Sequence, residues 1–366
     1  MWIKYFVKII IARSLVALAL LFMASTSVFS TEAVAATPTA SSSKPVRDLR
    51  VLTSIKPLQL IIASLIAEGD QLELLMDSAS SPHSYTIKPS DARKIRRADV
   101  IVWVGEDLES NLVKVLGNFN ALKNNSSTVE IMELMVLLEK LIKGQSAQNS
   151  RAYKFDLADY ADYTNYEGAG QDSKASKGSK KADRNSHNHD HADHNDADVH
   201  IWLYPPLVER VAFLVSEKLQ AMNPSKEQEY QKNLQVFTEQ LKIRMDLLSN
   251  KLTQFDGAGF ASIHNGFELF ANFFSLNYGG YIMDEHSAVF SPKQLSHIRQ
   301  KILDEELNCI FEEPLFNSKA LDGLTTLSKV NRQEVDILGG NIGVSAQGYF
   351  VFMDKLVADT ISCMGG

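Results

Sequence analysis

The longest helical repeat in the chain lies at residues 224–252, and it constrains the fold more than any other segment. Apolar side chains recur there every three or four positions for about thirty residues, or roughly 45 Å of α-helix. The stripe consists of Tyr230, Leu234, Phe237, Leu241, Met245, Leu248 and Leu252. A helix of that length can bridge two lobes, and we interpret it as a stiff connector. A long surface helix on one lobe is the alternative.

Short β-rich segments alternate with helical segments on both sides of this helix. The expected strands are 49–55, 72–76, 100–104 and 127–132 before it, and 260–263, 281–283, 309–311 and 334–338 after it. The expected helices are 56–67, 92–98 and 108–115 before it, and 267–276, 292–303, 319–330 and 349–363 after it. Such alternation indicates parallel pairing. The predicted fold is α/β, with two lobes that each have a mostly parallel sheet flanked by helices, joined by a long rigid helix.

The length of the chain agrees with two lobes, and its net charge excludes some classes of partner. About 320 residues follow the N-terminal leader, which is more than one core usually organises. We expect an N-terminal α/β lobe at 48–206, connecting helices at 207–254 and a C-terminal α/β lobe at 255–366. The formal net charge of −7 argues against nucleic acid or an anionic membrane surface as the partner.

The N-terminus has the order of a secretory signal peptide. Basic residues come first, an apolar stretch runs from Ser14 to Met23, and the small residues Ala33-Val-Ala-Ala36 follow. We predict a signal peptide at 1–36 and a flexible leader, rich in Thr, Ser and Pro, at 37–47. A membrane anchor is the alternative, because residues 2–23 are apolar enough for a tilted spanning helix. Either arrangement places the folded part outside the cytoplasm.

The chain has two cysteines, Cys309 and Cys363. In an oxidising compartment an isolated pair favours a disulfide over two free thiols or two metal ligands. Such a bond would join the C-terminal tail to a strand.

Residues 144–197 are rich in Ser, Lys, Asp, Asn and Gly and have no apolar period, so we predict a disordered loop. Four of the nine histidines lie near its end: His187, His189, His191 and His194. Tracts of this kind bind metal ions weakly and in many arrangements, which predicts an auxiliary metal-binding loop.

Three of the other five histidines lie where predicted strands give way to turns. His83 follows the strand 72–76, His264 closes the strand 260–263, and His200 lies in the alternating segment 198–203, expected as a strand. Ligands of open α/β sheets bind at the C-terminal ends of strands. A single histidine at a strand end is more often a hydrogen-bonded structural residue than a ligand. Together with the histidine tract and export they predict a metal site, and three imidazoles favour zinc over manganese.

The other histidines and acids of the chain do not indicate a catalytic site. We expect His286 and His297 to be solvated. Glu312 and Glu313 are adjacent on a predicted strand and so face opposite ways, which fits surface acids or acids that support a ligand rather than a catalytic pair. The sequence has no HExxH or GxSxG motif. A zinc hydrolase is the alternative from another class, and we expect that the chain is not an enzyme.

Several spaced segments resemble the metal-receptor proteins of bacterial ABC uptake systems, and within them the periplasmic zinc receptors of the ZnuA type. The resemblance covers nearly all of the chain after the leader. It is carried by residues 82–91, 98–105, 198–205, 263–270, 291–295 and 311–316, and the cysteine pair falls where these receptors carry a disulfide.

The resemblance implies a monomeric periplasmic receptor that holds Zn2+ between its lobes through His83, His200 and His264. It would deliver the ion to an ABC transporter permease in the membrane. Asp336, expected at the end of the last strand, is the candidate fourth ligand because manganese-type relatives carry an acid there; water is the alternative. A receptor for manganese or another divalent metal, or an adhesin-like metal-binding protein, is the other possibility.

Two positions depart from the family pattern. Pro82 stands where enterobacterial zinc receptors often have glutamate, and proline cannot coordinate. Asn265 follows His264 where the family often has aspartate, so the partner of the His264 ring stays open.

Overall fold

The computed structural model describes residues 47–122, 127–131, 198–255, 258–284, 289–290, 292–304, 306–316, 321–322 and 330–365. All of them belong to one compact unit, Val46–Gly366. The predicted signal peptide, nearly all of the leader, the histidine-rich loop with its four histidines, and His286 lie outside the described residues. Most of the helix expected at 319–330 also lies outside the described residues.

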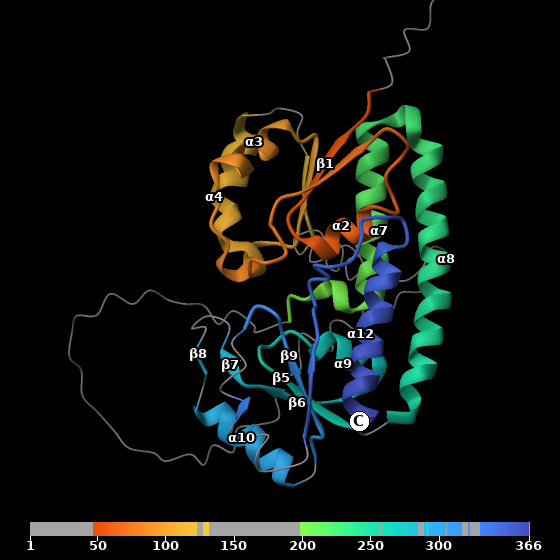
Figure 1. Cartoon of the computed structure of the whole chain (residues 1–366). Helices are drawn as coiled ribbons and strands as arrows, with labels where there is room; N and C mark the ends of the chain where they lie inside the picture. Colours follow the sequence, from red (N-terminus) through yellow and green to blue (C-terminus); the bar gives the residue numbers. More distant parts are fainter. Residues whose placement is uncertain are drawn as a thin grey trace, which may run out of the picture. The chain divides into compact units, whose positions relative to one another are not determined.

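The first sheet has four parallel strands in the order β2-β1-β3-β4 (Figure 1). The strands are β1 (Arg50–Thr53), β2 (Gln71–Leu74), β3 (Val100–Trp103) and β4 (Ser127–Glu130). The crossover helices are α2 (Lys56–Ile62), α3 (Pro89–Arg97) and α4 (Glu106–Leu122). Strand β3 is a run of four buried apolar residues between two neighbours, as expected for a strand that is covered on both faces.

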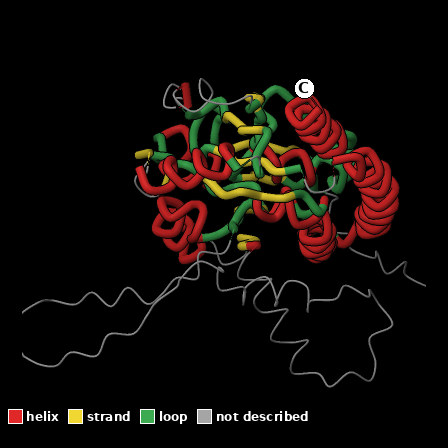
Figure 2. The backbone as a smooth tube through the Cα atoms, turned by 90° about the horizontal axis from the view of Figure 1, so that it is seen from below, coloured by secondary structure: helices red, strands yellow, loops and turns green. Residues whose placement is uncertain are grey.

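The second sheet repeats this architecture with the order β10-β9-β5-β6, again parallel. Its strands are β5 (Gly259–Ser262), β6 (Asn277–Tyr281), β9 (Cys309–Glu312) and β10 (Asn331–Glu334). Helices α9 (Glu268–Phe274) and α10 (Pro292–Leu303) belong to this half. Two parallel sheets flanked by helices confirm the predicted fold class (Figure 2).

The connecting helices are α7 (Pro205–Met222) and α8 (Glu227–Leu252), separated by the 3-10 turn η3 (Pro224–Lys226). Helix α8 packs beside α7 and the C-terminal helix α12 (Gly348–Gly365) (Figure 1). Six of the seven residues of the predicted apolar stripe are buried, Leu234 being partly exposed. Within the described residues, no helix combines the length and apolar character that a membrane crossing needs.

Asp70 fastens the first sheet to the start of α8. Its carboxylate accepts hydrogen bonds from the backbone N–H of Leu49 (2.9 Å) and of Ala67 (3.1 Å). It also accepts bonds from the Tyr230 hydroxyl (2.8 Å) and the Lys226 ammonium (3.2 Å). We call this set the Asp70 network. The Asp70 side chain is fully buried, so its charge depends on these four donors.

The predicted disulfide is present: Cys309, the first residue of β9, is bonded to Cys363 in α12, with a Cα–Cα distance of 5.6 Å. The Asn331 side chain adds a hydrogen bond to the Cys363 carbonyl at 2.8 Å. The C-terminal helix is thereby held to two strands of the second sheet.

The expectation of a strand at 198–203 is wrong. Residues 198–200 are irregular, and Ile201–Leu203 form the 3-10 turn η2. All six side chains are buried, so the alternation of polar and apolar residues does not mark an exposed and a buried face.

The last strand is also displaced from its predicted position. β10 covers Asn331–Glu334 rather than 334–338, so Asp336 lies in the loop after the strand. Val335, Ile337 and Leu338 looked like a strand because this loop is itself buried. A short antiparallel hairpin of β7 (Met283–Asp284) and β8 (Val289–Phe290) was not predicted.

Candidate metal-binding site

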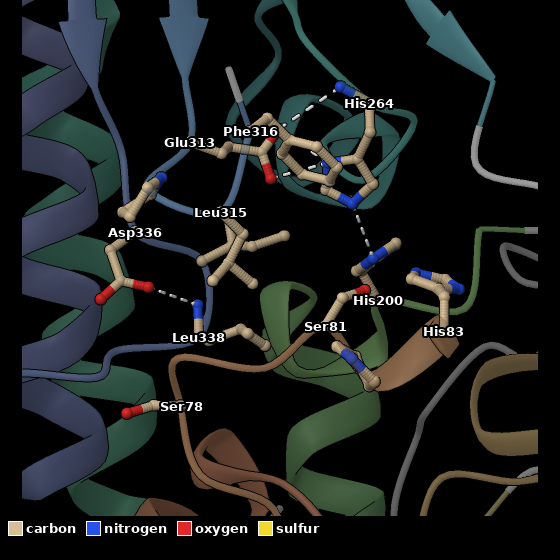
Figure 3. A pocket seen from close by; sticks show the side chains of 13 residues that line it. Ser78, Ser81, His83, His200, His264, Glu313, Leu315, Phe316, Asp336 and Leu338 are labelled. Carbon is tan, nitrogen blue, oxygen red and sulfur yellow. Dashed lines mark hydrogen bonds and ion pairs between the residues drawn. The ribbon is translucent and has the colours of Figure 1, made fainter. Parts of the chain in front are cut away.

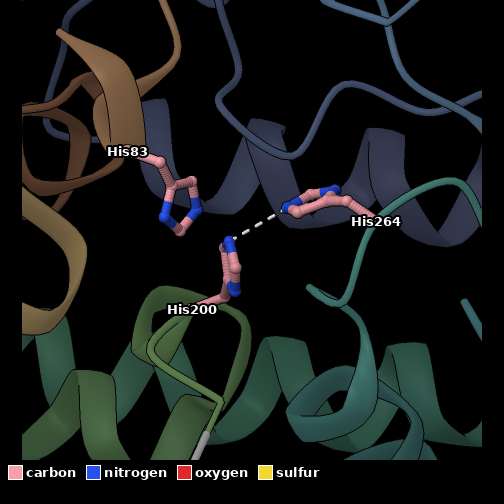
Figure 4. Close-up of side chains that lie close together, drawn as sticks. All are labelled: His83, His200 and His264. Carbon is pink, nitrogen blue, oxygen red and sulfur yellow. Dashed lines mark hydrogen bonds between the residues drawn. The ribbon is translucent and has the colours of Figure 1, made fainter. Parts of the chain in front are cut away.

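His83, His200 and His264 converge from three separate segments of the chain (Figure 4). His83 lies in the 3-10 turn η1 (Pro82–Ser84) after β2, His200 directly precedes η2, and His264 follows β5. One nitrogen of each ring can be chosen so that all three lie within 4.8 Å of one another. The ring centroids are 5.0 Å apart for His200 and His264, 5.6 Å for His83 and His200, and 6.1 Å for His83 and His264.

The imidazole of His200 is oriented by Asp198. One oxygen of that carboxylate accepts both the backbone N–H of His200 (2.9 Å) and its ring Nδ1–H (2.7 Å). The other oxygen accepts the backbone N–H of Leu269, in α9, at 3.1 Å. Burial alone would raise the pKa of Asp198, but His200 and these hydrogen bonds hold that pKa below its usual range. Asp198 therefore remains a carboxylate that accepts from the ring.

The imidazole of His264 is oriented by Glu313, which follows β9. Its Nδ1 lies 2.7 Å from one carboxylate oxygen and 2.6 Å from the other. The Ser262 hydroxyl donates to the His264 carbonyl at 2.6 Å, and the Phe316 ring lies 5.1 Å from the imidazole at a tilt of 32°. Backbone, ring edge and ring face of His264 are therefore all held in place.

These carboxylates decide which ring nitrogen is available for a ligand. Because Nδ1 of each ring donates to a carboxylate, the lone pair of the neutral ring is on Nε2. The two Nε2 atoms face each other at 3.2 Å. Two nitrogen ligands at about 2.05 Å from one tetrahedral zinc ion would be about 3.3 Å apart. The pair therefore already has the spacing that one zinc ion requires.

The space beside this pair depends on Gly266. A Cβ atom at that position would lie 2.8 Å from His264 Nε2 and 3.2 Å from His200 Cε1. Both distances are shorter than ordinary contact, so a larger residue would crowd the nitrogens.

The three histidines line a pocket whose walls come from loops of both sheets (Figure 3). Ser78, Ser81 and Pro82 come from the loop after β2, and Glu313, Leu315 and Phe316 from the loop after β9. Asp336, Ile337 and Leu338 come from the loop after β10. His200 and His264 are only 2% and 4% exposed, so both side chains are largely screened from bulk solvent.

Asp336 lines the same pocket but lies outside the group of three close ligand atoms. Its carboxylate accepts hydrogen bonds from the N–H groups of Leu338 (2.9 Å), Gly339 (3.0 Å) and Gly340 (2.7 Å). In Figure 3 it points toward Leu338 and away from the three rings. Of the other predicted positions, His297 is exposed on α10.

Asp198 and Glu313 contact His200 and His264, and the sequence did not identify either acid as their partner. Asp198 stands two positions before His200, a local signal that could have found it. Glu313 is 49 positions from His264, and only the fold brings them together. Its neighbour Glu312 instead forms an ion pair with Arg332, so the two adjacent acids contact different partners.

With this geometry in view, comparison with known proteins identifies the family. A family profile described as "ZnuA: Zinc-uptake complex component A periplasmic" matches residues 51–363. The chain belongs to the ZnuA family. The high-affinity zinc uptake system protein ZnuA of Haemophilus influenzae is 38% identical over 315 residues, which is 86% of this chain and 92% of the relative. The protein of the same name from Haemophilus ducreyi is 31% identical, over 86% of this chain and 93% of its own length.

Solved structures show the same fold. A crystal structure of ZnuA matches with a TM-score of 0.63 and 18% identity, over 87% of this chain and all of the other. The periplasmic zinc-binding protein TroA from Treponema pallidum matches with a TM-score of 0.62 and 16% identity, over 87% of this chain and 99% of the other. The ZnuA family is described as part of an uptake complex, which agrees with the expectation that the chain is not an enzyme.

Proposed function

We propose that this member of the ZnuA family is an extracytoplasmic zinc receptor that captures Zn2+ with His83, His200 and His264 and delivers it to an ABC transporter permease. The observation that carries the proposal is the His200–His264 pair, whose Nε2 atoms face each other at 3.2 Å while a buried carboxylate holds the far side of each ring. Two buried lone pairs at that distance repel each other unless a cation lies between them.

The ligand set favours zinc as the cargo. Imidazole nitrogen suits zinc, whereas manganese prefers a larger share of carboxylate oxygen. Supporting carboxylates behind two of the rings are the usual companions of histidine ligands to zinc, because they make the imidazoles more basic. The names of the Haemophilus relatives agree with this choice.

Three histidines leave one position of a tetrahedral ion for another ligand. We propose water there, with Asp336 as the protein group that would replace it if the loop after β10 moved. The amide hydrogen bonds to both Asp336 oxygens stabilise its present orientation and oppose that movement.

The remaining parts of the proposal concern how the receptor works in the cell. Residues 1–36 act as its signal peptide, and residues 37–47 form a leader. The folded part, with lobes at 48–206 and 255–366 joined by 207–254, acts as a monomer in the periplasm. His187, His189, His191 and His194 gather further ions weakly. The family's description as a periplasmic component of a zinc-uptake complex supports this assignment.

The experiment is a competition for Zn2+ between the full chain and a chelator of known affinity. The wild type should hold one ion tightly, and His83→Ala, His200→Ala and His264→Ala should each weaken that site. His297→Ala is the matched control, because this exposed histidine on α10 should not matter. The same competition with Mn2+ tests the choice of metal. Unchanged affinity in all three site variants would end the proposal.

A further inference from the structure

Helix α3 (Pro89–Arg97) concentrates positive charge in a chain whose formal net charge is −7. Its nine residues include four bases and a single acid, Asp91. The Asp91 side chain is buried, and it accepts hydrogen bonds from the Tyr85 hydroxyl (2.9 Å) and the Lys88 backbone N–H (2.7 Å). Because this acid is occupied inside the fold, every charged side chain that α3 exposes is a base.

Three of these bases share one face of the helix. Arg93, Arg96 and Arg97 are spaced at i, i+3 and i+4, which makes side chains neighbours on a helix surface, and all three are exposed. Their guanidinium groups form no ion pair with any other residue that the structure describes. The fourth base, Lys94, differs, because its ammonium donates to the Leu74 carbonyl of β2 at 2.6 Å. The three arginines therefore present their charges to the solvent.

Arg50 adds a fourth charge at the N-terminal edge of the first sheet. It is the exposed first residue of β1, and its backbone N–H donates to the carboxylate of Asp99 at 3.0 Å. The Asp99 N–H donates back to the Arg50 carbonyl at 2.8 Å. Since Asp99 comes two positions after α3, Arg50 lies beside the C-terminal end of that helix. We call the following residues the arginine surface: Arg50, Arg93, Arg96 and Arg97.

The N-terminal segment of the chain joins the fold at this same edge. Residues 1–46 lead into β1 through Arg47, whose side chain also forms an ion pair with Asp99 (Figure 1). The histidine cluster lies at the opposite ends of the strands, because His83 follows β2, which runs parallel to β1. Arg50 and the C-terminal end of α3 are therefore close to the N-terminal segment and away from His83.

The chemistry of the arginine surface fits a partner that carries many phosphate groups. A guanidinium presents a planar fork of N–H donors that pairs well with phosphate oxygens. At physiological salt, exposed charges more than about 8 Å apart are largely screened from one another. Negative charge elsewhere in the chain therefore does little to weaken attraction at this surface, and the net charge of −7 is a poor guide to it.

We propose that the arginine surface docks on the headgroups of anionic phospholipids and holds the receptor against the membrane by its first lobe. A membrane is favoured over an acidic protein because the segment that joins at this edge contains the apolar stretch 2–23, which the sequence predicts to enter a membrane. In this orientation the histidine pocket faces the surrounding solution, so the receptor can take up an ion while it is docked. The proposal goes beyond the zinc-receptor function and does not depend on it.

The test is co-sedimentation of residues 46–366 with lipid vesicles. This compact unit contains both sheets and the whole arginine surface, and removal of residues 1–45 excludes binding through the apolar N-terminus. The vesicles are made of phosphatidylglycerol and phosphatidylcholine, or of phosphatidylcholine alone as the uncharged control. We expect binding to the anionic vesicles only, and we expect that binding to weaken as salt is added.

The decisive variant combines Arg93→Gln, Arg96→Gln and Arg97→Gln. A basic side chain near an anionic membrane contributes roughly fivefold to the affinity, so the triple variant should bind the anionic vesicles about 100-fold more weakly. Replacement of the same three arginines by lysine keeps the charge and should keep most of the binding.

The matched control combines Lys232→Gln, Lys242→Gln and Lys251→Gln. These exposed lysines lie on α8, and their replacement changes the net charge by the same amount but should leave vesicle binding nearly unchanged. Circular dichroism and Zn2+ affinity should be the same in all of the proteins, because none of the replaced side chains belongs to the core or to the histidine pocket.

Three results would overturn the proposal. The first is equal binding to anionic and uncharged vesicles. The second is a lysine variant that loses as much vesicle binding as the glutamine variant of the arginine surface. The third is binding of soluble polyglutamate to the arginine surface without binding of the anionic vesicles, which would make the partner an acidic polypeptide. Each of these results leaves Zn2+ affinity untouched, so none of them can be confused with a failure of the proposed function.

Discussion

Both sheets are fastened to the neighbouring helices at the N-terminal ends of their strands, but by different chemistry. In the first sheet, Asp70 stands immediately before β2 and collects two amide donors, a hydroxyl and an ammonium, the last two from Tyr230 of α8 and Lys226 of η3. In the second sheet, Cys309 is the first residue of β9 and is joined covalently to α12. One fastening is ionic and hydrogen-bonded, and the other is a disulfide.

In both sheets the anchored end is the one that lies away from the histidine cluster. With their bases fixed, the opposite ends of the strands are free to end in the loops that carry His83, His264, Glu313 and Asp336. Because one connection is covalent and the other is ionic, reduction of the disulfide should weaken the second lobe, whereas substitution of Asp70 should weaken the first.

The largest expected effect comes from removing the disulfide. Cys309→Ser with Cys363→Ser opens a loop with a sequence separation of 54, which costs about 4 kcal/mol in the chain-entropy model. Denaturant unfolding followed by circular dichroism should show this loss, mostly in the second lobe. An unchanged unfolding midpoint would show that the hydrogen bond from Asn331 and the packing of α12 suffice without the covalent bond.

The next prediction compares Glu312 and Glu313, two adjacent acids at the C-terminal end of β9. Glu313→Gln weakens the acceptor behind His264, and we expect zinc affinity to fall by about 10- to 100-fold. Glu312→Gln is the matched control, because this acid pairs with Arg332 and should leave affinity unchanged. Chelator competition measures both. Equal losses in the two variants would mean that net charge, and not the contact with the ring, supports the ion.

A third effect tests the fastening of the first lobe. Asp70→Asn keeps the shape of the side chain but removes the charge that four donors share, and we expect a loss of about 2 kcal/mol in the free energy of unfolding. Asp48→Asn is the control: Asp48 also meets Lys226, at 2.7 Å, but is 55% exposed and should contribute less than about 1 kcal/mol. Zinc affinity should be unchanged in both. A loss of zinc affinity in Asp70→Asn would show that a change at the N-terminal end of β2 alters the position of η1, the turn that carries His83.

The smallest effect concerns Glu109, a buried acid in the first turn of α4, the helix that follows β3. Its carboxylate accepts the N–H groups of Val104 (2.8 Å) and Gly105 (3.3 Å) rather than a ring. Burial raises its pKa from 4.5 to about 7, although these amide bonds oppose the rise. The folded chain thus holds this proton more tightly than the unfolded chain.

The contribution of Glu109 to the free energy of unfolding is therefore constant below pH 4.5, falls as the pH rises from 4.5 to about 7, and is lowest above that. Glu109→Gln should remove this dependence. Relative to wild type, the variant should gain about 1–2 kcal/mol between about pH 5 and about pH 6.5. Urea unfolding at both values measures the difference, and a constant gap between the proteins would contradict the assignment.

The sequence predicted the parts of the fold that have a strong local pattern. The apolar run at 100–104 and the repeat at 224–252 correspond to β3 and α8, because burial on both faces or along one stripe leaves a clear period. The segments at 198–203 and 334–338 were misread, because loops that line a pocket can be as apolar as strands. Their form is decided by long-range contacts, such as that from Trp202 to the Ile337 carbonyl.

For the candidate site too, the sequence predicted the residues that have a local signal and missed those that depend on the fold. His83 and His264 were recognisable because each follows a predicted strand, and His200 because it lies in the alternating segment 198–203. Glu313 was not recognisable as the partner of His264, since adjacency of β5 and β9 is a property of strand order and not of local sequence. That β6 and β9 flank β5 from opposite sides is likewise visible only in the fold.

The absence of a side chain at Gly266 has a practical consequence. A single methyl group there would occupy space between His264 and His200, and its three nearest neighbours would all be atoms of these two imidazoles. We therefore expect Gly266→Ala to keep the fold and to weaken the binding of a metal ion between these two histidines.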